Sequence, residues 1–246
     1  MIKLKDYSSK PPESLKKKDL SDETKALIDR LGELHAVLMA EQQHAVLVIF
    51  QGMDGSGKDG AVRNVFDKCN PSGLSVYAFK KPTDEEFAHD FLWRVHKQTP
   101  AKGNIKIFNR SHYEDVLIQR VHGWIDEEKV NQRFDAINAF EDLLQFDNKT
   151  IVFKFYLHIS FEQQEIELRQ RMDEKDKHWK HNSGDWKERE HWDAYMRCYE
   201  DMLNRSRTPW TLVPVDSRWY RDYIVAKTMV ETLEKLKMEY PPLQED

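Results

Sequence analysis

The stretch that decides the fold reads AVLVIFQGMDGSGKDG and runs from Ala45 to Gly60. It opens with a continuous apolar run at 45–50, rich in β-branched residues, which is typical of a strand buried on both faces of a parallel sheet. A glycine-rich turn follows at 52–60, and a helical pattern comes directly after it. A buried strand, a turn of this kind and a helix together predict an α/β fold.

The glycine-rich turn has the spacing of a phosphate-binding loop. Gly52, Gly57 and Lys58 match the Walker A pattern, in which glycines let successive backbone N–H groups converge on an anion. The positive end of the next helix favours a phosphate at the same place. An ordinary glycine-rich βα turn is the alternative interpretation. The predicted phosphate-binding set is Gly52, Met53, Gly55, Ser56, Gly57, Lys58, Asp59 and Gly60.

The loop departs from the usual Walker A pattern at two acidic residues. Asp59 stands where a serine or threonine normally follows the lysine and ligates Mg²⁺. Asp54 lies inside the loop, where a carboxylate facing phosphate is repelled unless a hard cation lies between them. We therefore expect Asp54 to be a metal ligand and a catalytic residue, with an Asx turn that shapes the loop as the alternative.

A second motif follows the strand predicted at 105–109, where IKIFN runs into RSHYEDVLI. The carboxyl ends of parallel strands line the ligand crevice of an α/β sheet, so these side chains are candidates for the site. Asn109 stands where a Walker B strand would place an aspartate. Arg110 carries a fork of donors that suits phosphate oxygens, and an exposed ion pair is its weaker alternative.

Two carboxylates follow this arginine. We expect Asp115 to be functional, as a catalytic carboxylate and a metal ligand. Glu114 has two interpretations that the sequence leaves open. It is either an active-site acid or the second half of a capping box with Ser111.

Outside these motifs, strands and helices alternate, which predicts a three-layer α/β/α fold with a five-stranded parallel sheet and a single domain over 1–246. The further strands are expected at 74–79, 105–109, 151–159 and 211–215. Helices are expected from Ser21 or Asp22 onward and at 61–68, 84–98, 111–121, 127–146, 161–172 and 219–238. Residues 1–20 are interpreted as an irregular, solvated arm.

A charged excursion at 169–192 breaks this alternation. In phosphate-loop kinases a mobile lid follows the fourth strand, excludes water and brings positive charge to the transferred group. A solvated charged face is the alternative. The cations expected to act in the lid are Arg171, Lys175, Lys177 and Lys180.

Composition narrows the function classes. The 246 residues carry a net charge of −5 at pH 7, which disfavours a general nucleic-acid binder. No apolar run reaches the roughly 20 residues that span a bilayer, and no secretory signal stands at the start. The two cysteines, Cys69 and Cys198, have no metal-like spacing, so a reducing cytoplasm is expected.

Taken together, these motifs resemble the family-2 polyphosphate kinases over about residues 30–238. The loop at 52–60 matches the family pattern Gly-x-Asp-x-x-Gly-Lys-x-Gly. FNRSHYEDV at 108–116 resembles the family's second motif, and the lid at 169–192 and the stretch 209–221 also match. Three motifs in the same order are far more specific than any one of them.

The resemblance implies a thymidylate-kinase-like phosphate-loop fold with a helical lid. It implies reversible transfer of phosphate between inorganic polyphosphate and nucleotides, dependent on Mg²⁺, with Mn²⁺ as a substitute. The Asn109 version of the second motif resembles the subgroup that phosphorylates AMP as well as ADP. Adenine nucleotides are the expected acceptors, with guanine nucleotides as a second option. A homo-oligomer, dimer or tetramer, is also expected.

Carried over by position, Asp54 would hold Mg²⁺, while Lys58, Arg110 and Lys81 would contact phosphates. Arg171 and the lid lysines would contact polyphosphate or the transferred group. Two rival functions stay open: an ATP-dependent nucleotide kinase of the thymidylate type, and a phosphate-binding protein without activity. The missing hydroxyl after Lys58 counts against the first, and the carboxylates near the loop count against the second.

Overall fold

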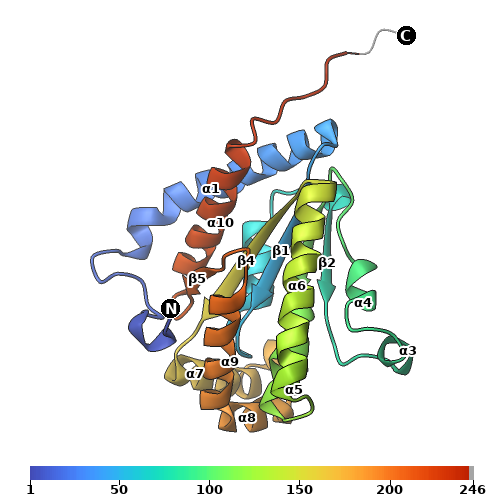
Figure 1. Ribbon diagram of the computed structural model, residues 1–246. Coiled ribbons are helices and arrows are strands. Elements are labelled where there is room, and N and C mark those ends of the chain that lie inside the picture. Colours follow the sequence, from blue (N-terminus) through green and yellow to red (C-terminus); the bar gives the residue numbers. More distant parts are fainter. Residues whose placement is uncertain (244–246) are drawn as a thin grey trace.

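Five parallel strands form the centre of the structure, a computed structural model that describes residues 1–243 (Figure 1). The strand order in the sheet is β2-β3-β1-β4-β5. The predicted strands and the α/β class are confirmed, and each strand ends within one residue of its expected position. The strands are β1 (Ala45–Gln51), β2 (Leu74–Ala78), β3 (Ile105–Asn109), β4 (Thr150–His158) and β5 (Thr211–Pro214).

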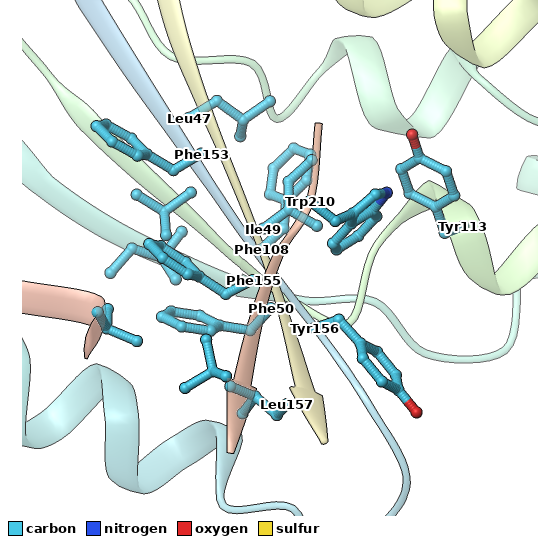
Figure 2. Packing of buried hydrophobic residues seen from close by; sticks show 14 of the residues in the cluster. Leu47, Ile49, Phe50, Phe108, Tyr113, Phe153, Phe155, Tyr156, Leu157 and Trp210 are labelled. Carbon is cyan, nitrogen blue, oxygen red and sulfur yellow. The ribbon is translucent and has the colours of Figure 1, made fainter. Parts of the chain in front are cut away.

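Strand β1 lies in the middle of the sheet, as its continuous apolar sequence predicts. All of its residues are buried, and it pairs with β3 on one side and β4 on the other. The rings of Phe50 in β1 and Phe155 in β4 stack with their centroids 5.4 Å apart (Figure 2). The strand that carries the glycine-rich turn is therefore held from all sides by the core.

The strand order creates a crevice beside β1. The connection that leaves β1 passes to β2 on one side, whereas the connection that leaves β3 passes to β4 on the other. Because these two connections diverge, the carboxyl ends of β1 and β3 border the crevice in which open α/β sheets bind ligands. The glycine-rich turn and the second motif both begin at this edge.

Helices cover both faces of the sheet. On one face, Lys154 and Tyr156 of β4 reach α6 (Glu127–Asn148) and α9 (Trp192–Arg205), which lie in front of the sheet in Figure 1. On the other face, α10 (Arg218–Glu234) packs against α1 (Lys17–Glu41) and α2 (Lys58–Val65). Among residues 1–243, no helix is long and apolar enough to cross a bilayer.

The helix expected at 84–98 is two separate single turns, α3 (Asp84–Phe87) and α4 (Trp93–His96). The interruption has a local cause, because the side chain of Asp90 accepts a hydrogen bond from the Leu92 backbone N–H at 2.9 Å. Such side-chain bonds compete with the helical pattern. The helix expected at 111–121 is also broken, into the 3-10 helix η3 (His112–Val116) and α5 (Ile118–Val121).

Most of residues 1–20 are exposed, as predicted, but the arm is anchored to the rest of the protein. Leu4 in η1 (Leu4–Asp6) is only 3% exposed, and its N–H donates to Glu200 of α9 at 2.8 Å. The Ser9 carbonyl accepts from the Asp216 N–H at 3.0 Å. Helix α1 also begins earlier than expected, at Lys17, because Asp19 caps the N–H of Lys16.

The charged excursion folds into short helices at the carboxyl end of the sheet, grouped at the lower end of the molecule in Figure 1. They are the last turn of α7 (Phe161–Asp173), η4 (Lys175–Lys180) and α8 (Ser183–Glu190). Helix α9 follows and was not expected, because the charged sequence before it hides its start. Its buried residues Tyr195, Tyr199 and Met202 recur at helical spacing.

A short 3-10 turn, η2 (Pro71–Gly73), precedes β2.

Candidate active site

Lys58 lies in the glycine-rich turn with its ammonium group directed at the turn itself. Its Nζ donates to the carbonyl oxygens of Gly52 and Met53, at 2.7 and 3.1 Å. The side chain is buried, and burial lowers the pKa of the ammonium group to about 8. Gly57 takes a left-handed backbone conformation, with φ 84°, and forms the N-cap of α2. The turn therefore encloses Lys58, and it ends at the N-terminus of α2, where an anion is favoured.

Asp54 and Arg110 join the first motif to the second. The guanidinium group of Arg110 donates to the Asp54 carboxylate, and the Arg110 N–H donates to the Phe50 carbonyl at 3.1 Å. Burial on its own raises the pKa of Asp54, but Arg110, Lys58 and Arg171 outweigh burial and hold the pKa below its ordinary value. The carboxylate is therefore ionised, which is the form in which an aspartate ligates a metal ion, and Arg110 pairs with it in this structure.

The structure places Glu114 in the site and not at a helix cap. Ser111 accepts a hydrogen bond from the Tyr113 N–H and not from the Glu114 N–H, so the predicted capping box does not form. Glu114 instead accepts from Gln51 of β1 at 3.0 Å and lies 3.9 Å from Arg110. Glu114 thus adds a second carboxylate beside the Asp54–Arg110 pair.

Asp59 connects the turn to β3 and to the lid. Its Oδ1 accepts from the side-chain amide of Asn109 at 2.6 Å, and its Oδ2 lies 3.0 Å from Lys180 Nζ in η4. Burial raises the pKa of Asp59, but the hydrogen bonds from Lys180 and Asn109 prevail and lower it. Position 59, which carries a hydroxyl residue in the usual Walker A pattern, therefore carries a carboxylate that forms an ion pair with Lys180 of the lid.

Within the lid, Arg171 forms an ion pair with Asp185 of α8 at 2.5 Å. Asp185 is buried, and its pKa is raised to about 6 by burial and by the nearby Asp54 carboxylate, against the opposing effect of Arg171. The family resemblance includes Asp185 in the lid but gives it no role, because its partner Arg171 lies 14 residues away in the sequence. Lys177 pairs with Glu174 at 2.6 Å, while Lys175 is exposed.

Asp115 lies on the wall of the same cavity as Arg110 and Glu114, but its carboxylate is held by other partners. It is 2% exposed and accepts hydrogen bonds from Arg94 at 3.2 Å and from Gln119 at 2.5 Å. Arg133 donates to its backbone carbonyl at 2.7 Å. Burial raises the pKa of Asp115, although Arg94 and Arg133 oppose this effect. Both carboxylate oxygens are thus engaged by the protein, which speaks against the predicted role of Asp115 as a metal ligand.

A cavity of about 1220 Å³ opens beside Arg110 and Glu114. Besides the predicted Arg110, it combines an aromatic wall with several further cations, of which the sequence predicted Lys81. The other residues come from segments distant in the sequence, so no local pattern could reveal them. The aromatic wall contains Phe79, Phe87, Phe91 and Trp124, and the cations are Lys80, Lys81, Arg94, Lys129 and Arg133.

The acidic residues present suit a cation that is shared with a substrate. In residues 1–243, no group of three or more His, Cys, Asp or Glu side chains is arranged to hold an ion. Asp54 and Glu114 nevertheless both lie against Arg110, so two carboxylates are near each other in the site. Mg²⁺ is commonly bound by one or two carboxylates together with substrate phosphates, and kinase chemistry generally needs a divalent ion. The donor set fits that mode of binding.

Comparisons with known proteins agree with this geometry. The chain is 46% identical over 215 residues to the AMP/ADP-polyphosphate phosphotransferase of Meiothermus ruber, covering 86% of this chain and 80% of the relative. It is 41% identical over 229 residues to the ADP-polyphosphate phosphotransferase of Rhodopseudomonas palustris, covering 87% and 79%. The crystal structure of polyphosphate kinase 2 from Arthrobacter aurescens TC1 superposes with a TM-score of 0.95 at 39% identity, covering all of this chain and 89% of that one. A family model described as polyphosphate kinase 2 matches residues 14–241, and the chain belongs to that family.

Proposed function

We propose that this chain transfers phosphoryl groups reversibly between inorganic polyphosphate and the adenine nucleotides AMP and ADP. The observation that carries the assignment is the position of Arg110. It lies on the wall of the large cavity and also binds Asp54 of the glycine-rich turn. A nucleotide in the cavity and a phosphate on the turn would therefore meet at the same guanidinium group.

The cavity is the proposed acceptor site. Its volume is sufficient for a nucleotide, since pockets for small ligands measure roughly 300–1,000 Å³. The aromatic side chains, among them Phe87 and Trp124, offer faces on which a base can stack. Lys81 and the arginines place positive charge around the ribose and phosphate. Stacking does not distinguish the purines, so we extend the proposal to guanine nucleotides, and a panel of nucleoside mono- and diphosphates tests it.

The turn and the lid form the proposed donor site. Backbone N–H groups at the start of α2 and the Lys58 ammonium group face one side of the crevice. The lid contributes Arg171, Lys175, Lys177 and Lys180 on the other side. A chain of phosphates carries regularly repeated negative charge, so it needs cations placed in series. The four lid cations lie between residues 171 and 180 of the sequence, which supports a polyanionic donor.

In this arrangement the terminal phosphate oxygen of the nucleotide attacks the end phosphorus of the polyphosphate in line, without a covalent enzyme intermediate. The bridging P–O bond on the opposite side of that phosphorus breaks, and the polyphosphate leaves one phosphate shorter. The protein then contributes positioning and charge stabilisation, which dominate phosphoryl transfer. Lys58 turns from the Gly52 and Met53 carbonyls to the donor phosphate. Asp54, with Glu114, would hold Mg²⁺, which neutralises phosphate charge when bound. Mn²⁺ suits the same oxygen donors.

A donor exchange tests the proposal. Purified protein is incubated with Mg²⁺, with AMP or ADP as acceptor, and with polyphosphate or ATP as donor, and the nucleotides are separated by chromatography. We expect ADP and ATP to form from AMP with polyphosphate as sole donor, and Lys58→Ala to abolish this. Phosphorylation of AMP by ATP but not by polyphosphate would favour a nucleotide kinase instead.

We also propose that the chain associates into a dimer or tetramer. Leu143 and Phe146 lie one turn apart on α6, and 75% of the Phe146 surface is exposed. A second copy covering these side chains would remove apolar surface from water. Light scattering of the purified protein measures the mass directly, and Phe146→Ser should lower it if this face is used.

A further inference from the structure

The last helix sends a buried arginine to the phosphate-binding turn. Arg221 of α10 is 1% exposed, and its Nη1 donates to the carbonyl oxygen of Gly57 at 2.9 Å. Building on the proposed function, we propose that Arg221 is a positioning residue, which orients the Gly57–Lys58 peptide so that the Lys58 N–H faces the donor phosphate. Arg221 touches neither substrate nor metal and acts through the backbone of the turn.

The geometry of one peptide unit carries this argument. The Gly57 carbonyl also accepts the first hydrogen bond of α2, from the Ala61 N–H at 3.0 Å. In a planar trans peptide the carbonyl and the next N–H point in opposite directions. With its oxygen fixed toward the helix and Arg221, the peptide directs the Lys58 N–H out of the helix end, where anions bind. Gly57 has no side chain to restrict its backbone dihedral angles, so the hydrogen bond from Arg221 limits the rotation of the Gly57–Lys58 peptide.

Arg221 is held in place by Asp222, which is in turn held by Asn64 of α2. Its Nε donates to Asp222 Oδ1 at 2.8 Å, and Asp222 Oδ2 accepts from the Asn64 side chain of α2 at 2.8 Å. The guanidinium group is therefore paired with a carboxylate and tied to the same helix that it orients. Because the pair is neutral, its main effect on the turn is geometric and not a gain in positive charge.

Arg221 also explains why residue 60 is a glycine, although its backbone conformation would allow other residues. Gly60 lies within α2 without a positive φ, where most residues are tolerated. A Cβ atom at Gly60 would lie 3.0 Å from Arg221 Nη1 and 3.2 Å from Nη2. A Cβ atom at Gly57 would lie 2.5 Å from Nη1. Both glycines thus leave room for the guanidinium group to reach the turn.

Arg221→Lys tests the proposal, because lysine keeps a cation beside Asp222 but loses the fork that reaches Gly57. We expect the KM for polyphosphate to rise, or kcat to fall, by about 10- to 100-fold, the scale of a small misplacement of reacting groups. The KM for AMP should stay within about twofold. Val230→Ala, a buried change farther along α10, is the control. It should lower the melting temperature without moving either KM.

Gly60→Ala crowds Arg221 from the other side and should reproduce the same pattern. If the two residues act as one unit, combining Gly60→Ala with Arg221→Lys should add little to either change alone. Folded Arg221→Lys protein with kcat and both KM values within about twofold of the original would overturn the proposal, and so would full additivity.

Calorimetric titration with tripolyphosphate gives a readout that does not depend on turnover. We expect Arg221→Lys to weaken its binding by about tenfold or more. If the unmodified protein binds tripolyphosphate but transfers no phosphate, the proposed function fails while the role of Arg221 is still measured. Equal affinities of the two proteins would overturn that role.

Discussion

At the scale of single residues, Lys58 is the cation that the glycine-rich turn encloses. It is enclosed by the turn and contacts two carbonyl oxygens that a phosphate can replace. Lys58→Ala should reduce kcat by at least about 100-fold, the scale of losing one preorganised charge at a transition state. The melting temperature should change little, and Lys68→Ala, an exposed lysine after α2, should be neutral in both measurements. Near-normal turnover by Lys58→Ala would contradict the phosphate-loop assignment.

The pKa of Lys58 gives a separate prediction for pH. Burial lowers it to about 8, so the ammonium group loses its proton as the pH rises through that value. The protonated form is the one that binds phosphate, hence kcat/KM for polyphosphate should fall on the alkaline side of about pH 8, since kcat/KM follows the free enzyme. Lys58→Arg should move that decline to higher pH. An unchanged alkaline decline in this variant would assign it to another group.

Asn109 donates a hydrogen bond from its side-chain amide to the carboxylate of Asp59. Asn109→Asp would place two carboxylates about 2.6 Å apart and loosen the link between the turn, β3 and Lys180. We expect slower phosphorylation of both AMP and ADP, and recovery when Asp59→Asn is added, because this exchange restores one donor and one acceptor. Initial rates with both acceptors measure the effect. A loss confined to AMP would show instead that position 109 selects the acceptor.

At the scale of elements, the basic lid predicts a response to salt. Binding of a polyanion through several cations weakens steeply as ionic strength rises. The KM for long polyphosphate should therefore increase with salt more than the KM for AMP, and alanines at Lys175, Lys177 and Lys180 should reduce the difference. A variant with alanines at the exposed Lys16, Lys17 and Lys18 should behave like the unmodified protein. Equal salt responses for both substrates would exclude the lid as the polyphosphate site.

The elements also show where sequence reasoning succeeds. Strand β1 and the turn after it were predictable because burial, glycine spacing and the lysine all belong to one short stretch. Helices α3 and α4 were not, because a single side-chain bond from Asp90 interrupts an otherwise helical pattern. The same limit applies to the site. Arg110 follows a strand and could be given a role from the sequence. Asp185 and Arg221 lie in stretches that match the family, but their contacts depend on the tertiary fold and could not be predicted.

At the scale of the whole molecule, the N-terminal arm should contribute to stability. Leu4 is buried, and the arm is bonded to α9 and to the end of β5. Leu4→Ala should lower the free energy of unfolding by about 2–5 kcal/mol, as other buried leucines do, with kcat unchanged. Urea unfolding should show one cooperative transition, as expected of a single domain. Lys5→Ala on the exposed side is the control, and an equal loss there would mean that Leu4 has no special role.

The two cysteines of the molecule are buried, one in the loop after α2 and one in α9, and burial raises the pKa of the Cys69 thiol to about 12. Thiolates are the form that reacts with alkylating dyes, so both native thiols should be nearly inert in the folded protein. Trp179, by contrast, lies in η4 of the lid with 77% of its surface exposed. A dye attached through Trp179→Cys would therefore mark this one position without removal of either native cysteine. The lid could then be followed by fluorescence during turnover.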